Sequence, residues 1–345
     1  MSRRTHAATR QDVALRAGVA PSTVSLILNR TPGPRIPDET RQRVIAAARD
    51  LGYQSSSIAR ALVTGRTNTI GVVMHFVDQP FQGYTTAILD GFWKGIMGRG
   101  YRMLLALGSR DACVGGLYRE RSVDWLIVFA APVESDDDEL GNLDKAGFPA
   151  VFVGTRPNGI RCDYVDIDNV KVARQATERL IEAGHRRILH LAGPLEVNSA
   201  AVDRRKGYLE ALALAGIPAD EDLIVDCSFN RSFVAERLGR VMDAGLRFTA
   251  IFAANLGMAQ GALQLLLARG IRVPEEVSLI GIDAERDPDP TGFTIDTYAQ
   301  PLQAIGLEAA SILRRRMDAS LAVPGRSTFL PCTYVPGRSI APPPA

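Results

Sequence analysis

The chain has 345 residues, of which 46% are hydrophobic, and its formal net charge is +2. This composition can bury large cores and predicts two or three domains. The four cysteines lie far apart without a CxxC motif, which excludes a disulfide framework and a zinc site. No run of 18 apolar residues occurs, and the basic start MSRRTHAATR lacks an apolar segment, so we expect a cytoplasmic protein without a membrane partner.

Charge is distributed unevenly along the sequence. Residues 1–66 contain 11 arginines and 4 acidic residues, a local balance of +7, whereas the other 29 basic and 34 acidic residues give −5. A basic amino-terminal module on a mildly acidic body is typical of a nucleic-acid binder. The alternative is a basic solvated face of no particular function. It is less favoured because the excess coincides with the motif that follows.

Two short helices joined by a tight turn are predicted for residues 9–29, TRQDVALRAGVAPSTVSLILN. Thr9 with Asp12 three residues later forms a capping box that starts the first helix. Gly18 allows the positive φ that a sharp turn requires. The second helix places Val24, Ile27 and Leu28 on one face. Its opposite face carries small or polar side chains suited to the major groove, namely Ser22, Ser25, Leu26 and Asn29.

This pattern predicts a helix-turn-helix whose second helix is the recognition helix. On its own, the pair could equally be an ordinary helical hairpin. A third helix, opened by Pro37-Asp38-Glu39 and ended by Gly52, favours the first interpretation. Its predicted inner face consists of Val44, Ala48 and Leu51.

The three-helix unit resembles the headpiece of the lac-repressor (LacI/GalR) family of bacterial transcription regulators. The resemblance is carried by DVALRAGVAPSTVSLILN, DETRQRVIAAARDLGY and IARAL, which cover nearly all of the first 62 positions. It implies a set of DNA contacts at Thr9, Pro21, Ser22, Thr23, Ser25, Leu26, Asn29, Tyr53, Ile58 and Leu62.

Residues 54–68 are predicted to form a hinge helix and linker. A helix as short as Ile58–Leu62 is marginal alone and should order only against a partner. In the family this helix folds on DNA and inserts a leucine into the minor groove, and Leu62 is the matching residue here. Ser55-Ser56 stand where the family usually has Pro-Asn. A plain flexible linker is the alternative.

From Thr69 onward, apolar runs alternate with amphipathic stretches, which predicts parallel sheets covered by helices on both faces. Strands are expected at Ile70–Met74, Tyr101–Leu107, Trp125–Phe129, Ala150–Val153, Ile188–Leu191, Leu223–Val225, Ala250–Ala253 and Val277–Ile282. Helices are expected at Gly83–Met97, Val170–Ala183, Arg204–Ala215, Phe233–Ala244 and Met258–Arg269.

The resemblance continues through this region, with the pieces LIEAGHRRILHLAGP, VDRRKGYLEALALAGI and ALQLLLARGIRVPEEVSLIGID. It implies an α/β core similar to periplasmic-binding proteins, with two doubly wound parallel-sheet subdomains joined by three crossover strands. The expected fold class is therefore an all-α helix-turn-helix headpiece plus this two-lobed core. The expected domains are a headpiece at 1–53, a hinge at 54–68 and a core at 69–345. Its lobes should span roughly 69–165 plus 299–326, and 166–298 plus 327–345.

Three polar residues fall where open α/β sheets bind ligands, at the carboxyl ends of strands. Asn255 and Asp283 follow predicted strands, and Arg204 opens a predicted helix. Each could alternatively be an ordinary turn residue. An amide, a carboxylate and a guanidinium suit a ligand with several hydroxyls. The family resemblance implies a larger set of effector contacts, at Phe81, Arg204, Phe229, Asn255, Asp283 and Gln300.

An enzyme is not expected, because no GxGxxG, P-loop, GxSxG or HExxH motif occurs and the four histidines are scattered. No cofactor or metal is implied. The remaining alternatives are a DNA-binding regulator and a sugar-binding transport protein, and the basic headpiece favours the regulator. We therefore predict a homodimeric regulator, in this family most often a repressor. Its expected partners are double-stranded DNA with a near-palindromic operator and a small-molecule effector, a carbohydrate by class, acting either as inducer or as corepressor.

Overall fold

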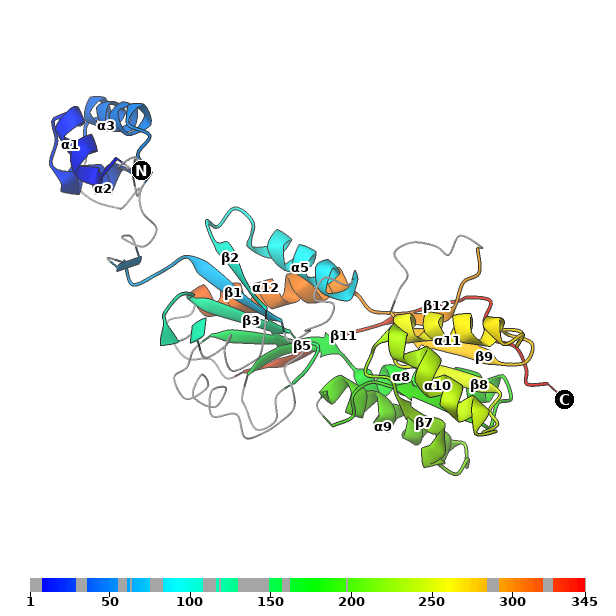
Figure 1. The fold of residues 1–345 in the computed structure, drawn as a ribbon. Helices are drawn as coiled ribbons and strands as arrows, with labels where there is room; N and C mark the ends of the chain where they lie inside the picture. Colours follow the sequence, from blue (N-terminus) through cyan, green and yellow to red (C-terminus); the bar gives the residue numbers. More distant parts are fainter. Residues whose placement is uncertain are drawn as a thin grey trace. The chain divides into compact units, whose positions relative to one another are not determined.

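The computed structural model separates the chain into two compact units, Met1–Asn68 and Thr69–Ala345 (Figure 1). It describes residues 8–28, 36–54, 61–62, 64–74, 83–107, 116–117, 119–129, 149–156, 162–196, 198–283, 292–318 and 325–344.

The first unit contains three helices, α1 (Arg10–Ala17), α2 (Pro21–Leu28) and α3 (Asp38–Asp50). The predicted capping box is confirmed. The backbone N–H of Asp12 donates to Thr9 Oγ1 at 3.3 Å, and Thr9 N–H donates to the Asp12 carboxylate at 2.8 Å. Gly18 ends α1 with φ 65°. The helices enclose a small apolar core of Val13, Ala14, Ala17, Val24, Ile27, Val44, Ala47 and Ala48. Leu28 and Leu51 pack at the edge of this core and are only partly buried.

The amino-terminal lobe of the second unit is a six-stranded sheet in the order β11-β5-β4-β3-β1-β2. All five pairings are parallel. Helices α5 and α12 pack against each other closely, because a Cβ atom on Gly91 would lie 2.0 Å from the carbonyl oxygen of Gln303. The elements are β1 (Thr69–Met74), α5 (Gly83–Ile96), β2 (Arg102–Leu107), β3 (Trp125–Phe129), β4 (Ala150–Val153), β5 (Asp163–Ile167), α12 (Leu302–Asp318) and β11 (Ser327–Leu330).

The carboxy-terminal lobe has a sheet of the same size in the order β12-β10-β9-β8-β6-β7, parallel except for the β10–β12 pair. The predicted doubly wound class is thereby confirmed. Its elements are α8 (Asn169–Glu182), β6 (Ile188–Ala192), α9 (Ser199–Leu214), η1 (Glu221–Leu223), β7 (Ile224–Asp226), α10 (Arg231–Asp243), β8 (Ala250–Ala253), α11 (Leu256–Ala268), β9 (Ser278–Ile282), β10 (Asp296–Ala299) and β12 (Thr333–Val335).

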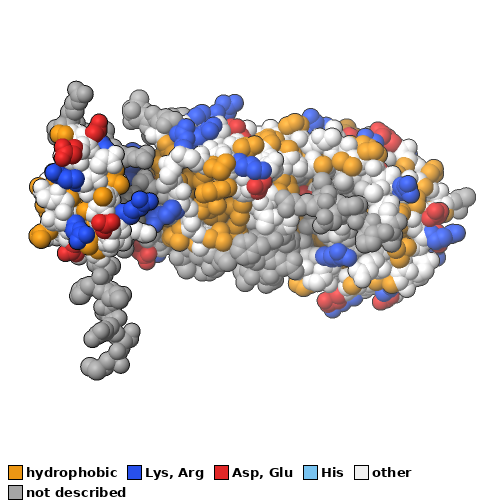
Figure 2. Space-filling view, turned by 90° about the horizontal axis from the view of Figure 1, so that it is seen from above, with side chains coloured by type: hydrophobic (Ala, Val, Ile, Leu, Met, Phe, Trp, Pro, Cys, Tyr) orange, Lys and Arg blue, Asp and Glu red, His pale blue; other side chains and the backbone are white. Residues whose placement is uncertain are grey.

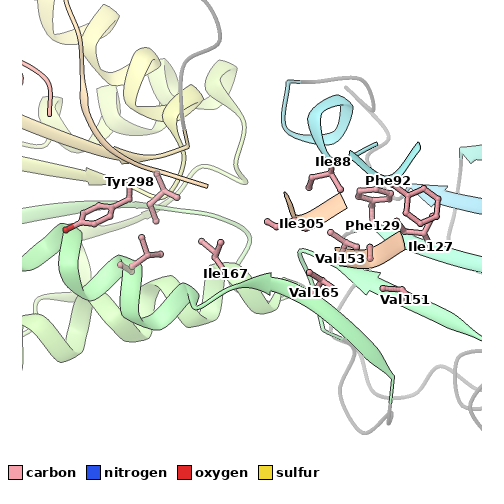
Figure 3. Packing of buried hydrophobic residues seen from close by; sticks show 14 of the residues in the cluster. Ile88, Phe92, Ile127, Phe129, Val151, Val153, Val165, Ile167, Tyr298 and Ile305 are labelled. Atoms are coloured by element: carbon pink, nitrogen blue, oxygen red, sulfur yellow. The ribbon is translucent and has the colours of Figure 1, made fainter. Parts of the chain in front are cut away.

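The chain passes between the lobes three times, after β5, after β10 and after β11. Strand β11 pairs in parallel with β5, so the third passage follows Leu330 and not residue 326, where the sequence had placed it. Buried apolar residues continue from one lobe to the other along β5, where Val165 and Ile167 belong to one cluster (Figure 3). The crossover strands thus share the lobes' cores and do not act as bare linkers.

Two predicted boundaries differ from the observed ones. Helix α9 begins at Ser199, not at Arg204, because the side chain of Asn198 caps it by accepting the N–H of Ala201 at 3.1 Å. Leu223 was expected to begin a strand. It ends the 3-10 turn η1 instead, and the Asp220 side chain caps that turn.

Candidate functional site

In the first unit, one face of α2 carries the side chains predicted to contact DNA. Ser22 is exposed, whereas Ser25 and Leu26 are partly exposed. Arg10 on α1 donates from Nη1 to Ser25 Oγ at 3.0 Å, which adds a positive charge beside α2 that the sequence prediction did not include. Among the other predicted DNA contacts, Thr9 caps α1, Pro21 and Thr23 lie in the first turn of α2, and Tyr53 packs against the headpiece core.

Leu62 is the most exposed large hydrophobic residue of the described chain, with 89% of its surface accessible. A fully exposed leucine is an apolar group without a partner. Two further predicted DNA contacts, Asn29 and Ile58, lie outside the described residues.

In the second unit, Arg204 is the centre of a buried polar cluster. It lies in the second turn of α9 and is only 5% exposed. Its Nε donates to Asn169 Oδ1 at 2.8 Å, and its Nη1 donates to the carbonyl oxygen of Ala254. Because the donors of a guanidinium have a fixed planar geometry, these two bonds orient the group. Arg204 therefore joins the start of α8 to the end of β8.

Asp283 follows β9 directly, as predicted, and adopts a φ of 96°, a conformation rare for residues other than glycine. Its N–H donates to the Tyr298 carbonyl oxygen at 2.9 Å, and its own carbonyl accepts from Thr297 Oγ1 at 2.6 Å. Burial raises the pKa of Asp283 to about 6, while the Arg204 guanidinium and a hydrogen bond from Gln300 oppose that rise. Such backbone strain and a shifted carboxyl pKa are common at ligand sites.

Phe229 lies beside the same guanidinium, in the turn between β7 and α10. The Cζ atom of Arg204 is 5.4 Å from the centre of the Phe229 ring. A Cβ atom on Gly193 would lie 2.4 Å from the Phe229 ring, so the ring sits in space that only glycine leaves open. An aromatic ring next to a guanidinium offers a surface for stacking a ring-shaped ligand.

Asn255 has a structural role within this cluster. It is the N-cap of α11, where its Oδ1 accepts the N–H of Met258 at 2.7 Å. Its Nδ2 donates to the carbonyl oxygen of Phe229 at 3.0 Å. Asn255 thereby holds the turn that presents the Phe229 ring, and its contact with an effector stays a prediction.

The crossover strand β5 contributes a carboxylate that the sequence did not predict. Asp166 is 2% exposed and accepts hydrogen bonds from Tyr164 Oη at 2.6 Å and from Asn169 Nδ2 at 2.7 Å. Burial raises the pKa of Asp166, and the two hydrogen bonds and the nearby Arg204 limit that rise. A chain of hydrogen bonds thus runs from β5 through Asn169 to Arg204.

Tyr84 on α5 extends the cluster into the amino-terminal lobe. A Cβ atom on Gly154 would lie 2.5 Å from the Tyr84 hydroxyl oxygen, so this glycine leaves the space that the hydroxyl occupies. The pKa of Tyr84 is raised by burial and further by the carboxylates of Asp166 and Asp283, while Arg204 lowers it. These electrostatic effects place the phenol near the charged groups of both lobes.

One sequence signal could have identified part of this extension. In DYVDIDN, residues 163–169, Tyr164 and Asp166 alternate with apolar residues, as polar side chains on one face of a strand do. The segment was not predicted as a strand because its acidic residues interrupt the apolar run. The sequence pattern gave no comparable signal for Tyr84.

Other candidates are placed away from this chemistry or outside the described chain. Phe81 is not among the described residues. His185 has its ring nitrogens 2.9 Å from Thr249 Oγ1 and 2.9 Å from the Ala341 carbonyl oxygen, which agrees with the structural role expected for it. Within the ranges that the structure describes, no cluster of three His, Cys, Asp or Glu residues is arranged to hold a metal ion. Nor does any described helix have the length and apolar character needed to cross a bilayer.

A helix-turn-helix unit together with two doubly wound lobes defines a class of protein, the DNA-binding regulators with a periplasmic-binding-protein-like body. Two family models match the chain accordingly. "Bacterial regulatory proteins, lacI family" matches residues 9–56, and "Periplasmic binding protein-like domain" matches residues 177–340.

Curated relatives extend this match over nearly the whole chain. The HTH-type transcriptional regulator CelR of Thermobifida fusca is 35% identical over 92% of this chain and 94% of its own length. The HTH-type transcriptional repressor PurR of Vibrio atlanticus (strain LGP32) is 31% identical over 90% and 92%. The chain therefore belongs to the LacI family of bacterial regulatory proteins. It is a DNA-binding transcription regulator, and the transport-protein alternative is not supported.

Solved structures agree with this assignment. The transcriptional regulator CelR–cellobiose complex has a TM-score of 0.72 and 32% identity, covering 96% of this chain and 99% of that chain. The lac repressor dimer bound to operator and the anti-inducer ONPF has a TM-score of 0.83 at 24% identity, covering 97% and 99%, and supports the fold.

Proposed function

We propose that this regulator binds a near-palindromic operator as a homodimer and acts as a repressor whose DNA binding responds to a carbohydrate. The observation that carries the effector site is the buried cluster around Arg204, where a guanidinium, the Asp283 carboxylate and the Phe229 ring meet at the ends of β8 and β9. A related regulator of 32% identity has been solved with cellobiose, which makes cellobiose the first ligand to test.

The proposed effector contacts are the cluster residues that the sequence singled out. Gln300 donates from Nε2 to Asp283 Oδ1, so both residues belong to one polar unit. The remaining proposed contacts are Arg204, Phe229, Asn255 and Phe81, the last on the sequence alone. Hydroxyl groups suit this set, because carboxylate and amide oxygens accept from them and an aromatic ring packs on the apolar face of a sugar.

On the DNA side, we propose that α2 lies in the major groove with Ser22, Ser25 and Leu26 facing the bases. Arg10, held against Ser25, is positioned to approach a phosphate. The exposed Leu62 suits a wedge between base pairs in the minor groove, because burying this side chain on DNA would remove its apolar surface from water. Residues 1–53, 54–68 and 69–345 would then act as headpiece, hinge and effector-binding core.

The proposed dimer uses the outer edge of the amino-terminal sheet. Figure 2 shows hydrophobic side chains gathered on the face that carries β2 and α5. The large exposed ones are Trp93 (40%), Met97 (62%), Met103 (37%), Leu104 (39%) and Leu105 (40%). An exposed edge strand with apolar residues is normally covered by another element or another chain. A second copy of this regulator would supply that cover and bring two headpieces to one operator.

Operator selection from a random DNA library with the full-length protein tests this proposal. We expect a near-palindromic consensus whose binding changes in the presence of cellobiose or another sugar of a screening panel. Asp283→Ala should bind the same operator without ligand and should no longer respond to it, because a carboxylate that anchors hydroxyls is missing. Failure to enrich any sequence would reject the regulator model. An Asp283→Ala protein with an unchanged response would remove this residue from the site.

The recognition helix has its own test in the same assay. Leu26 can make only apolar contacts, for example with a thymine methyl group, whereas arginine can bind guanine O6 and N7. Leu26→Arg should therefore change the selected bases and not merely tighten binding. Identical consensus sequences for both proteins would contradict the placement of Leu26 at the bases.

A further inference from the structure

The charges of the polar cluster are not balanced. Asp166 and Asp283 provide two carboxylates, whereas Arg204 provides one guanidinium, and Asp166 and Arg204 are 2% and 5% exposed. Burial raises the pKa of both carboxyls, and the Asp166 charge raises the pKa of Asp283 further. Each carboxylate therefore destabilises the charged form of the other. A bound anion would meet the same repulsion in a site with little water to screen it.

The donors of the cluster are turned toward acceptors of the protein itself. Arg204 donates from Nε to Asn169 and from Nη1 to the Ala254 carbonyl. Asn255 donates to the Phe229 carbonyl, and Gln300 donates to the Asp283 carboxylate. Using these groups to bind an anionic ligand would require the loss of bonds that fix the turn at Phe229 and the plane of the guanidinium.

One acceptor of the cluster, in contrast, is unused. Gln300 is 7% exposed, and its Oε1 is buried without a hydrogen-bond partner in the part of the chain that the structure describes. The same amide is fixed by its bond to Asp283, so Oε1 lies within a side chain's length of that carboxylate. Buried polar atoms in proteins are nearly always paired, and an acceptor left over beside a ligand site calls for a donor from the ligand.

We propose that the site selects an uncharged, hydroxyl-rich saccharide, which donates hydrogen bonds to Asp283 and to Gln300 Oε1, and that it rejects anionic sugars such as sugar phosphates and uronates. This inference rests on the proposed placement of the effector at the Arg204 cluster. It adds the charge class of the ligand and makes Gln300 a residue that determines specificity.

Isothermal titration of the full-length protein with matched sugar pairs tests the proposal. The neutral probes are cellobiose, maltose, lactose and D-glucose, and each is paired with its 6-phosphate or uronate form. We expect at least one neutral probe to bind and its anionic counterpart to bind at least tenfold more weakly. An anionic form that binds as tightly as its neutral partner, or a panel in which no neutral sugar binds, would overturn the proposal.

Two variants assign the discrimination to the residues named. Asp283→Asn keeps the shape of the side chain but removes its charge, so the ratio between neutral and anionic affinities should shrink several-fold. Gln300→Leu removes the free acceptor and should weaken the neutral sugar about tenfold. Asp243→Asn, at an exposed ion pair with Arg269 on the far side of α10, is the control and should leave the ratio unchanged. A ratio that Asp283→Asn does not alter would refute the electrostatic account. Operator selection is scored separately, so a regulator with an anionic effector would contradict this inference and leave the proposed function standing.

Discussion

The two lobes share one strand order but close their sheets differently at corresponding edges. In the amino-terminal lobe the edge strand β2 has six residues and exposes Met103, Leu104 and Leu105. In the carboxy-terminal lobe the edge strand β7 has only three residues, and Arg237 donates to the Asp226 carbonyl there. Short, charged edges resist pairing with other chains, whereas long apolar edges invite it. One lobe thus presents an edge suited to association and the other an edge suited to solvent.

The interiors of the lobes differ as well. Strands β1 and β6 hold the same place in their sheets, next to the edge strand. The core of β1 is apolar, with Val72 fully buried, whereas β6 buries His190 between the rings of Phe252 and Tyr208. Arg204 is buried in the same lobe. The carboxy-terminal lobe therefore carries the polar chemistry of the core, and its stability should depend on charge and pH more than that of its neighbour.

Removing the central guanidinium should have the largest effect. Arg204→Met would leave the Asn169 amide oxygen and the Ala254 carbonyl without their donor, and the two carboxylates without a counter-charge. Breaking a buried charged network costs about 3–5 kcal/mol, which urea denaturation would measure. Arg205→Met is the matched control, because Arg205 pairs with the exposed Glu221 at 2.6 Å and such pairs contribute about 1 kcal/mol or less. Equal losses in both variants would show that Arg204 is not a structural centre.

A second test concerns the buried imidazole of β6. Burial lowers the pKa of His190 from 6.5 to about 4, with the Phe252 carbonyl opposing and two arginines adding to that change. The unfolded chain then takes up a proton near pH 6.5 that the folded lobe accepts only near pH 4. Stability is therefore lost as the pH falls between these values, by about 3 kcal/mol in total. His190→Gln, which does not titrate, should flatten this slope in urea melts from pH 7 to pH 4. A slope that persists unchanged in the variant would assign it to other groups.

The difference between the sheet edges gives a third prediction. Leu104→Lys places a charge on the apolar edge of β2 and should weaken self-association by about 2 kcal/mol, roughly thirtyfold. Sedimentation velocity over a range of concentrations would measure it. Leu214→Lys at the end of α9 in the other lobe is the control, since that leucine is also exposed, at 73%. If both variants associate like the parent, β2 is not the contact between copies.

The smallest expected effect is on ligand affinity and pH. A saccharide that donates hydroxyl hydrogen bonds to Asp283 requires its ionised form, and the pKa of that carboxyl is about 6. Affinity should therefore fall as the pH falls through 6, by about tenfold between pH 7 and pH 5, or about 1.4 kcal/mol. Titration calorimetry with the bound sugar of the panel would record this change. The same titration on Asp283→Asn should show almost no pH dependence, and a tenfold change there would point to another group.

The sequence was sufficient wherever local rules decide structure. The Thr9–Asp12 capping box, the turn at Gly18 and the apolar stripe of Val13, Ala14 and Ala17 gave the helix-turn-helix before any coordinates. Strands with continuous apolar runs, such as β3 and β8, were predicted with the observed bounds. Asp283 was identified for a related reason, since a polar residue directly after such a strand lies at a sheet edge where ligands bind.

Tertiary structure decided what depends on contacts between distant segments. Strands β5, β10, β11 and β12 escaped prediction because their polar and short sequences become strands only by pairing with partners far along the chain. The companions of Arg204 were equally hidden. Asp166 and Tyr84 are ordinary residues in the sequence, and only the packing of β5 and α5 brings their carboxylate and phenol to the same buried guanidinium. Their importance arises from low-dielectric proximity, and sequence spacing does not encode that proximity.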